Sequence, residues 1–348
     1  METYEETLMM YRDYVIYKHI LSVVPPVLLI IGTFGNIFSF FILIKKNVQK
    51  ASTYCYLIVL AVMDLLVLYV GLFRLWLGQF MINIEEISNG LCKLVKFLGY
   101  FCSDVSVWLI VAVTIERTVV VLFPLKARLC NARTSRLCIY ILMLIFLLVN
   151  CHFLWSVNLQ HFSYNSSIIS KCQAKIGYIY IVDIIWPWVD AVIYSFLPFL
   201  IIIILNSLII RNLITAKKKR NDLRQHSLLL SNHSQQMAGS ETSHKITCML
   251  LVISFVFLVT TLPMAIVLIH TSLADSVVDD STLTRRILIY SIAEMLMYLN
   301  HSINFFLYYA TGSIEICRND TRRQPRKESL KTQKLLHLNA IESLSSHE

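Results

Sequence analysis

Long apolar stretches, separated by short polar segments, run through most of the chain. A helix needs about 20 mostly apolar residues to cross the hydrocarbon layer of a bilayer. Seven stretches reach this length, and no internal repeat of about 20–50 residues divides them into separate units. They predict an all-α membrane protein, a seven-transmembrane helix bundle, with spans over residues 20–44, 54–78, 92–122, 136–157, 178–210, 246–271 and 287–309.

The basic residues orient this bundle in the membrane. Lys and Arg are frequent in 45–53, 123–135 and 211–245 and after residue 310, whereas 79–91 contains none. Loops rich in Lys and Arg favour the cytoplasmic side, so the N-terminus is expected outside the cell. The expected parts are an extracellular N-terminal tail, the bundle with a short amphipathic cytoplasmic segment after its last span, and a disordered cytoplasmic tail, over residues 1–19, 20–317 and 318–348.

Composition and charge support this interpretation. Charged residues make up 15% of the chain, whereas an ordinary soluble domain has about 25%. The net charge of +9 follows from the basic cytoplasmic segments, so no nucleic-acid partner is expected. The first 19 residues carry three glutamates and no basic start before an apolar core, unlike a cleaved signal peptide. The sequence contains no hydrolytic triad, phosphate-binding glycine loop or metal-ligand spacing, so an enzyme is not expected.

Two of the nine cysteines lie where a disulfide can persist. With this topology only Cys92 and Cys172 are at the outer edge of the bundle, on the oxidising side. We predict a disulfide that joins the start of the third span to the loop before the fifth; two free thiols are the alternative. The same loop holds Asn165 in an N-glycosylation sequence, and Cys317, just past the last span, is a candidate for palmitoylation or a free thiol.

Several spans contain residues that a lipid-facing helix would not carry. Asn36 interrupts an apolar run, Asp64 lies in the middle of LAVMDLLVLYV, and NHSINFFLYY closes the last span. Polar and ionisable groups are costly in a membrane unless partners satisfy them. Pro198 and Pro263 each remove a helix hydrogen bond and free a carbonyl four residues earlier. Each of these signals is weak alone, but their order along the chain is specific.

This order resembles that of the rhodopsin-like (class A) G-protein-coupled receptors over nearly all of residues 20–317. Within the family, STYCYLIVLAVMDLL and NHSINFFLYYATG look most similar to invertebrate neuropeptide receptors of the FMRFamide-receptor-like group and to their vertebrate orphan relatives. The resemblance rests on Asn36, Asp64, Cys92, Glu116, Arg117, Thr118, Pro198, Phe257, Pro263, Asn304 and Tyr308.

The resemblance implies a receptor at the plasma membrane that couples an extracellular ligand to a heterotrimeric G protein, with receptor kinases and an arrestin as further partners. It also implies that Arg117 pairs with Glu116 at rest and is freed to contact the G protein when the sixth helix moves outward. The residues that it assigns to coupling and activation are Glu116, Arg117, Asn304, Tyr308, Phe257, Pro263 and Pro198.

Asp64 needs a cation, a proton or a cage of hydrogen bonds, because an unpaired buried carboxylate is very costly. In related receptors such a cluster binds a sodium ion, which would then be an allosteric modulator. The alternative is a set of dry polar contacts between helices. The residues expected to surround Asp64 are Ser106, Asn300, Asn304 and Asn36.

The ligand class is narrowed first by exclusion. Gly99 occupies the position where the resemblance to amine receptors would require an aspartate, and the last span has no Lys to hold retinal. The outer halves nevertheless hold charged and aromatic residues, and these predict a net acidic, aromatic cavity. The residues expected to line it are Arg74, Tyr100, Asp104, Trp186, Asp190, Tyr194 and Glu294.

Such a cavity favours a ligand with a cationic or amidated end, most simply a short peptide, with Glu294 or Asp190 as the acidic anchor. An internal Arg74–Glu294 bridge is the structural alternative. Other functions left open are an orphan receptor for a small non-peptide ligand and a decoy that binds without signalling. A channel or transporter is disfavoured because inverted repeats and matching broken helices are missing from the sequence.

The chain departs from the family pattern at several positions. Thr261 replaces an aromatic residue near the sixth-helix proline, and Ser243 replaces an acid that would hold the arginine. Phe305 stands where the family usually has proline in the last span. Because Phe305 has an amide that can bond the carbonyl of His301, we expect a straighter helix here than in relatives that carry the proline, with no sharp bend centred at 301–305.

Overall fold

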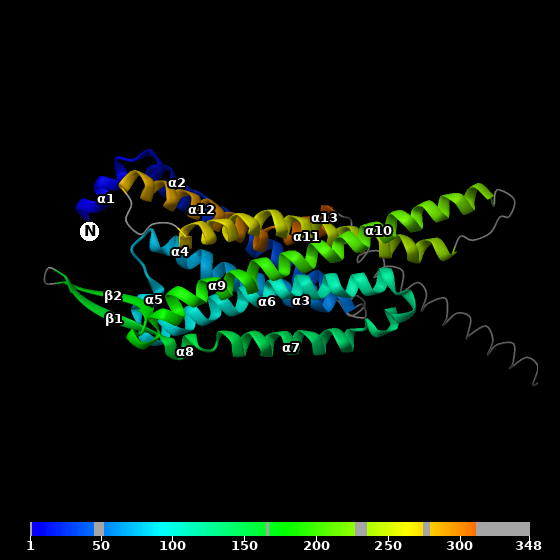
Figure 1. Cartoon of the computed structure of the whole chain (residues 1–348), viewed down its shortest axis with the longest axis horizontal. Coiled ribbons are helices and arrows are strands. Elements are labelled where there is room, and N and C mark those ends of the chain that lie inside the picture. The colour runs from blue at the N-terminus through cyan, green and yellow to red at the C-terminus, as the bar shows by residue number, and fades with distance from the viewer. Residues whose placement is uncertain (1, 45–51, 165–166, 227–234, 274–278, 311–348) are drawn as a thin grey trace, which may run out of the picture.

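The computed structural model describes residues 2–44, 52–164, 167–226, 235–273 and 279–310. Long helices lie side by side in one elongated bundle, and a two-stranded hairpin extends from one end of it (Figure 1). Six helices of the described chain are long and apolar enough to cross a membrane. A further long helix, α12 (Asp280–Ser302), carries Arg285, Arg286 and Glu294 and completes a seven-helix bundle.

The seven long helices comprise thirteen segments in chain order, because several are interrupted by π-helical turns or short breaks. They are α2 (Arg12–Leu43); α3 (Ser52–Val67), η1 (Leu68–Phe73) and α4 (Arg74–Gly78); α6 (Asn89–Leu122); α7 (Ala132–Asn150); η4 (Tyr180–Ile185), α9 (Trp186–Asp190), η5 (Ala191–Phe196) and α10 (Leu197–His226); α11 (Gln235–Leu273); and α12 followed by α13 (Asn304–Ala310). The short elements are α1 (Glu2–Met9), α5 (Ile84–Ile87), η2 (Pro124–Leu129), α8 (Phe153–Ser156), β1 (Val157–Tyr164), β2 (Ser167–Ala174) and η3 (Ile176–Tyr178).

Helix α6 lies at the centre of the bundle, in contact with α3, α7 and α10. In the most apolar 18-residue stretch of α6, 67% of the residues are buried. In the corresponding stretch of Ala132–Ser156, which includes α7, only 22% are buried. The core around it is apolar and includes Ile110 and Val111 of α6 together with Ile202 and Phe257 of its neighbours. Because α6 is central, its polar side chains face other helices and not lipid.

The π-helical turn η5 lies directly before the proline of the fifth helix. In a π-helix each carbonyl bonds the N–H five residues later, but the carbonyl of Ile193 would there need an N–H from Pro198, which has none. Trp108 of α6 fills the gap, because its Nε1 donates to the Ile193 carbonyl oxygen at 3.0 Å. The missing proline hydrogen bond is thus replaced by a tie between the third and fifth helices.

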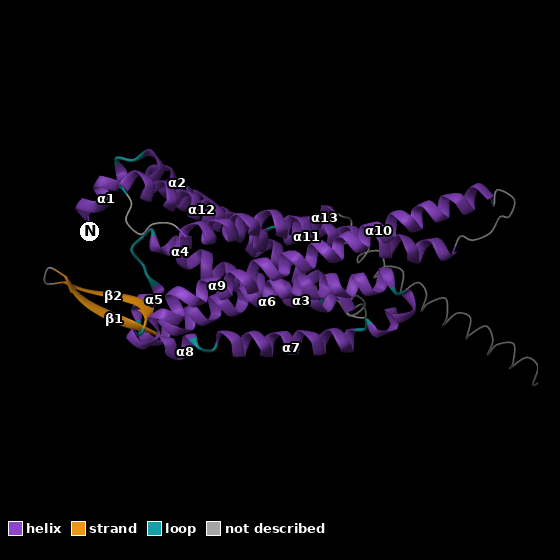
Figure 2. Ribbon diagram, in the orientation of Figure 1, coloured by secondary structure: helices purple, strands orange, loops and turns teal. Residues whose placement is uncertain are grey.

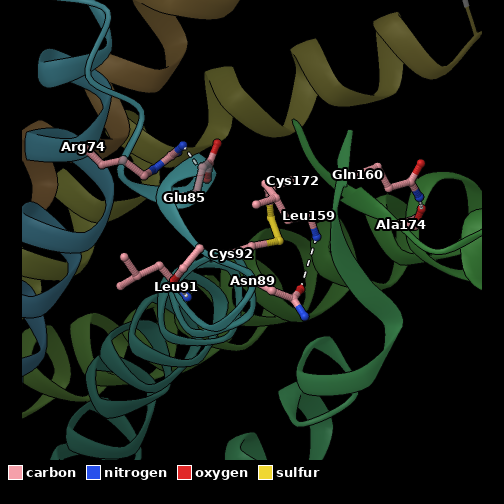
Figure 3. The surroundings of a disulfide bond; sticks show 10 residues. Arg74, Glu85, Asn89, Leu91, Cys92, Leu159, Gln160, Cys172 and Ala174 are labelled. Atoms are coloured by element: carbon pink, nitrogen blue, oxygen red, sulfur yellow. Dashed lines mark hydrogen bonds and ion pairs between the residues drawn. A yellow bond between two sulfur atoms is a disulfide. The ribbon is translucent and has the colours of Figure 1, made fainter. Parts of the chain in front are cut away.

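The segment before the fifth helix forms an antiparallel hairpin, which the all-α expectation did not include (Figure 2). Hairpin pairing satisfies the backbone groups of a segment that leaves the helical bundle. Residue Cys172 of β2 lies opposite Leu159 and is bonded to Cys92 near the start of α6. The predicted disulfide is therefore present, and an Asn89 side chain that accepts from the Leu159 N–H at 3.2 Å supports the same junction (Figure 3).

Helical structure extends beyond the expected spans at both ends of the bundle. The expected N-terminal tail is folded, since α1 precedes α2 and Lys18 Nζ lies 2.6 Å from Glu5 Oε1. The hydrogen bond from Lys18 lowers the pKa of Glu5 below its ordinary value. At the end of the bundle away from the hairpin, α10 continues to His226 and α11 begins at Gln235, beyond the expected span ends at 210 and 246.

The seventh helix is interrupted at one residue, and the expected hydrogen bond from the Phe305 amide to the His301 carbonyl is not among its contacts. It ends at Ser302 and resumes at Asn304, with Ile303 between the two parts. The His301 carbonyl, which we expected to bond the Phe305 amide, instead accepts from Asn36 Nδ2 at 2.9 Å. A side chain of α2 thus takes the acceptor on which a continuous helix depends.

A glycine at the crossing of α2 and α12 gives a stability prediction. A Cβ added at Gly32 would lie 3.1 Å from the backbone Cα of Ser302 and would overlap the Leu68 side chain. We expect Gly32→Ala to destabilise the fold by about 1–3 kcal/mol, because the α12 backbone cannot move aside freely. Thermal unfolding of the purified protein should show this as a lower Tm.

Gly99 on α6 provides the matched control for this substitution. A Cβ added there would have no atom within 4 Å. Gly99→Ala should leave stability unchanged or raise it by up to about 1 kcal/mol, because alanine restricts the unfolded chain and favours helix. Equal unfolding temperatures for Gly32→Ala and Gly99→Ala would contradict the close helix crossing.

Candidate functional site: an outer cavity and a buried polar network

A cavity of about 340 Å³ opens between the helices in the half of the bundle that carries the hairpin. Its wall combines aromatic, charged and methionine side chains from α4, α5, α6, α9, η5, α11 and α12. This mixture of apolar surface and a few polar groups is typical of a small-ligand site. The lining residues include Arg74, Glu85, Lys96, Gly99, Tyr100, Asp190, Tyr194, Met264, Tyr290, Glu294 and Tyr298.

Most of the side chains that the sequence predicted for the cavity lie on its wall. These are Arg74, Tyr100, Asp190, Tyr194 and Glu294.

Asp104 and Trp186 do not line the cavity, and their assignment to it is corrected. Asp104 is buried between α6 and α7, where its Oδ2 accepts from Asn150 Nδ2 at 2.9 Å. Trp186 is buried in a separate aromatic cluster, with its ring edge-on to Phe153 at 5.3 Å and to Tyr100 at 5.9 Å. Both residues lie on helix faces that pack against a neighbouring helix, α7 for Asp104 and α8 for Trp186, and not on the faces that line the cavity.

The sequence analysis missed five polar side chains of this wall, namely Glu85, Lys96, Ser103, Tyr290 and Tyr298. Lys96 lies four residues before Tyr100, so the two occupy one face of α6, and this spacing could have revealed it. Glu85 lies in a segment expected to be an outer loop, and only the folding of α5 brings it to the cavity.

Arg74 forms its ion pair with Glu85 and not with Glu294. The Arg74 Nη1 and Glu85 Oε2 atoms are 2.8 Å apart, and both side chains are more than half shielded from solvent (Figure 3). In the described part of the chain neither Glu294 nor Asp190 has an ion-pair partner. Two acidic side chains of the cavity therefore retain uncompensated charge when they are ionised.

A second cavity, of about 410 Å³, adjoins the first between α2 and α12. The two share Tyr290 and Glu294 on their walls. The second is mainly apolar, with Leu21, Leu75 and Ile287 among its lining side chains. Glu294 thus belongs to the boundary between a polar aromatic cavity and an apolar one.

Deeper in the bundle, Asp64 is fully buried and receives three hydrogen-bond contacts. Ser106 Oγ donates to its Oδ1 at 2.7 Å, and His301 Nδ1 lies 2.8 Å from the same oxygen. Asn304 Nδ2 donates to the other oxygen, Oδ2, at 2.6 Å. Asn36 joins the cluster through the His301 carbonyl. Four helices therefore converge on one carboxylate.

Asn300 takes no part in this arrangement, although it is buried. Neither its Nδ2 nor its Oδ1 has a hydrogen-bond partner among the described residues. Asn300 lies four residues before Asn304 and His301 lies three before it, and both spacings place two residues on one helix face. His301, which the sequence analysis did not select, occupies the place next to Asp64.

Near the end of α6 that lies away from the cavity, Glu116 and Arg117 are both buried. Arg117 Nη2 lies 3.7 Å from Glu116 Oε1, which is a long ion pair, and the Arg117 Nε has no hydrogen-bond partner in the described chain. Glu116 is held more firmly by three hydroxyl donors from α3 and α7, as charge-assisted hydrogen bonds. These donors are Ser52, Thr53 and Ser135, at 2.6, 3.0 and 3.0 Å.

Residues 35–308 match the family described as 7 transmembrane receptor (rhodopsin family), which covers more than half of the chain. The chain belongs to the rhodopsin family of seven-transmembrane receptors. It is accordingly a multi-pass receptor of the plasma membrane that acts through a G protein, and it is not an enzyme.

Several peptide-hormone and neuropeptide receptors are similar to it, with sequence identities of 24–27%. The growth hormone secretagogue receptor type 1 of Sus scrofa is 27% identical over 295 residues, which is 81% of this receptor and 74% of the relative. The thyrotropin-releasing hormone receptor of Gallus gallus is 25% identical over 318 residues, 85% and 77% of the two chains. The FMRFamide receptor of Drosophila melanogaster is 24% identical over 295 residues, 81% of this receptor and 50% of the relative.

The remaining assigned positions of the receptor fall into two groups. Phe257 is fully buried in the core, Pro263 lies inside α11 and Pro198 near the start of α10. Asn165 and Cys317 lie outside the described residues, as do the side chains of Ser243 and Tyr308. Glycosylation, palmitoylation and the role of Tyr308 therefore stay predictions.

Proposed function

We propose that this receptor binds a short peptide with a cationic or amidated end in the outer cavity, and that Glu294 is its acidic anchor. The observation that carries the proposal is the charge arrangement around Arg74. Arg74, a cation of the cavity wall, is already paired with Glu85 at 2.8 Å, while Glu294 has no ion-pair partner among the described residues. A half-buried carboxylate without an ion-pair partner favours a ligand that brings a positive group or an N–H donor.

The net charge of the cavity supports the same ligand chemistry. Once Arg74 and Glu85 are paired, the wall retains Asp190 and Glu294 against one cation, Lys96. An amidated end offers two N–H donors to a carboxylate without adding negative charge, whereas a free carboxylate end would be repelled. The adjoining apolar cavity would accept a hydrophobic side chain of the same ligand.

The relatives support a peptide ligand only in general terms. One is named for thyrotropin-releasing hormone and another for FMRFamide, and the resemblance to neuropeptide receptors points in the same direction. The volumes of about 340 and 410 Å³ suit a ligand of a few residues or a small non-peptide molecule, which is the second candidate. We favour the peptide because two adjoining cavities with one acidic boundary suit a chain that carries separate polar and apolar groups.

Signalling in this proposal follows the sequence of events expected for the family. Ligand binding shifts the packing around Phe257, the cytoplasmic end of α11 moves outward, and Arg117 leaves Glu116 to contact a heterotrimeric G protein. Receptor kinases and an arrestin then act on serines of the cytoplasmic tail, where added phosphate charge creates a binding surface. Lipid of the surrounding membrane contacts the apolar outer faces of the helices.

The test is a screen of short amidated peptides in cells that express this receptor with a promiscuous G protein. For a peptide that activates it, Glu294→Gln should raise the half-maximal concentration about 10- to 100-fold. This range corresponds to loss of one charge-assisted hydrogen bond, about 1.5–3 kcal/mol. Asp190→Asn, tested in parallel, should have a smaller effect if Glu294 is the main anchor.

Glu86→Gln is the matched control, because Glu86 lies on the same outer face but does not line the cavity. The activating peptide should have the same half-maximal concentration at Glu86→Gln as at the wild-type receptor. Surface expression of every variant is measured with an extracellular tag, so that loss of receptor is not taken for loss of affinity. Unchanged potency for both Glu294→Gln and Asp190→Asn, at equal surface expression, would reject the acidic anchor.

A further inference from the structure

Asp64 lies in the middle of the second transmembrane helix with no exposed surface, so its negative charge must be balanced inside the protein. Both of its oxygen atoms already have partners. Ser106 and His301 meet Oδ1, and Asn304 meets Oδ2, all within 2.8 Å. Of these three, only His301 can carry a positive charge.

The resemblance implies a sodium ion at this carboxylate, and the side chains present do not fit one. Hard cations take oxygen ligands such as carboxylates, carbonyls and water. Two of the three groups that face Asp64 present nitrogen atoms, namely the imidazole of His301 and the amide Nδ2 of Asn304. The oxygen of Asn304 is without a hydrogen-bond partner among the described residues, but the imidazole ring stands against the carboxylate oxygen that an ion would share with Ser106.

We propose that the imidazole of His301 occupies the place beside Asp64 where the resemblance implies sodium, and that its Nδ1 takes over the contact with Oδ1 that an ion would make. This partner of Asp64 belongs to the protein itself and does not exchange with the solution. Sodium should therefore have no effect on the conformational balance of the wild-type receptor.

The surroundings of His301 support this assignment. The ring has no exposed surface, its Nδ1 is 2.8 Å from Asp64 Oδ1 and 3.4 Å from Ser106 Oγ, and its Nε2 is 3.5 Å from the Tyr194 hydroxyl. The groups that face it therefore come from α3, α6 and η5, and Asn36 of α2 contacts its carbonyl. Asp64 is the single acid among these contacts, and no other base forms an ion pair with Asp64 in the described chain.

The contact with Tyr194 places the His301 ring between two sites. Tyr194 lines the outer cavity and also reaches His301, so one side chain links the cavity wall to the buried network. A movement of η5 would therefore change the contact between Tyr194 and His301 and, through it, the contact of His301 with Asp64. A freely exchanging ion would have no covalent tie to α12, whereas His301 moves together with that helix.

The experiment uses purified full-length receptor without ligand or G protein, so its outcome does not depend on the proposed peptide. Thermal unfolding is recorded in sodium chloride and in N-methyl-D-glucamine chloride at equal ionic strength. The wild-type Tm should agree in the two salts within about 1 °C. In His301→Ser the space and a hydroxyl oxygen become available, and sodium should raise the Tm by roughly 2–4 °C.

Asp64→Asn in the His301→Ser background should abolish this gain, because the carboxylate would supply the main attraction for the ion. His301→Asn, which also offers an oxygen, is the second variant if His301→Ser does not fold. A sodium-dependent rise in the wild-type Tm that Asp64→Asn removes would overturn the proposal, and this arm needs no His301 variant. Folded His301→Ser without any response to sodium would overturn it as well, since the imidazole would then not stand in the place of an ion.

Discussion

Replacing Cys92 by Ser should remove most of the receptor from the cell surface. The disulfide between Cys92 and Cys172 closes a segment with a sequence separation of 80 residues. In the chain-entropy description a loop of this length is worth about 4.5 kcal/mol, against a total stability of about 5–15 kcal/mol for a typical fold. Loss of the bond also releases β2 from α6, and with it the hairpin at the outer end of the bundle.

The measurement is surface expression by flow cytometry with an extracellular tag, together with the Tm of whatever protein can be purified. Cys92→Ser and the double variant with Cys172→Ser should be equally impaired, because each single change already breaks the bond. Cys248→Ser, at an exposed free thiol on α11, is the control and should behave as wild type. Wild-type surface expression of the double variant would show that the disulfide is dispensable.

Arg117→Ala should lower nucleotide exchange on the G protein by roughly 30-fold or more, while the receptor still folds and reaches the surface. Arg117 lies near the cytoplasmic end of α6, where its contact with Glu116 is long, at 3.7 Å, and its Nε has no hydrogen-bond partner in the described chain. Glu116 is meanwhile satisfied by Ser52, Thr53 and Ser135. The arginine is therefore weakly held and can be released at small cost.

Truncation of one member of a buried charged contact costs about 2–5 kcal/mol, which corresponds to a loss of roughly 30-fold or more in complex formation. Nucleotide exchange is measured in membranes, without agonist and with any peptide that the screen identifies. Arg136→Ala is the matched control, since Arg136 is an exposed arginine near the cytoplasmic end of α7. Exchange by Arg117→Ala at the wild-type rate, with equal surface expression, would contradict the role assigned to Arg117.

The helical bundle could be predicted because the signals for it are local. A stretch of about 20 apolar residues must form a helix in lipid, where each backbone group has to be bonded within its own segment. The charged residues of α12 weaken its apolar signal, but the polar residues at its end identify it as the seventh helix of the family. The disulfide also followed from the sequence, since the topology leaves two cysteines at the outer edge.

The hairpin and the interrupted seventh helix could not be predicted in this way. Both depend on contacts with partners that are distant in sequence. The hairpin is anchored to α6 through Cys92, and the carbonyl of His301 is taken by Asn36, 265 residues earlier in the chain. A substitution of proline by phenylalanine restores a backbone donor, but it does not ensure that the acceptor is free.

The sequence by itself determined which chemical groups this receptor places inside the membrane: a carboxylate at Asp64, an arginine at Arg117 and acids at Asp190 and Glu294. Only the tertiary structure decided the partner of each group. Residues three and four positions apart share a helix face, so the sequence left both Asn300 and His301 as possible neighbours of Asn304 at Asp64, and the fold places His301 there. In the same way, the position of α5 lets Glu85 form the ion pair with Arg74, and Glu294 on the cavity wall has no ion-pair partner in the described chain.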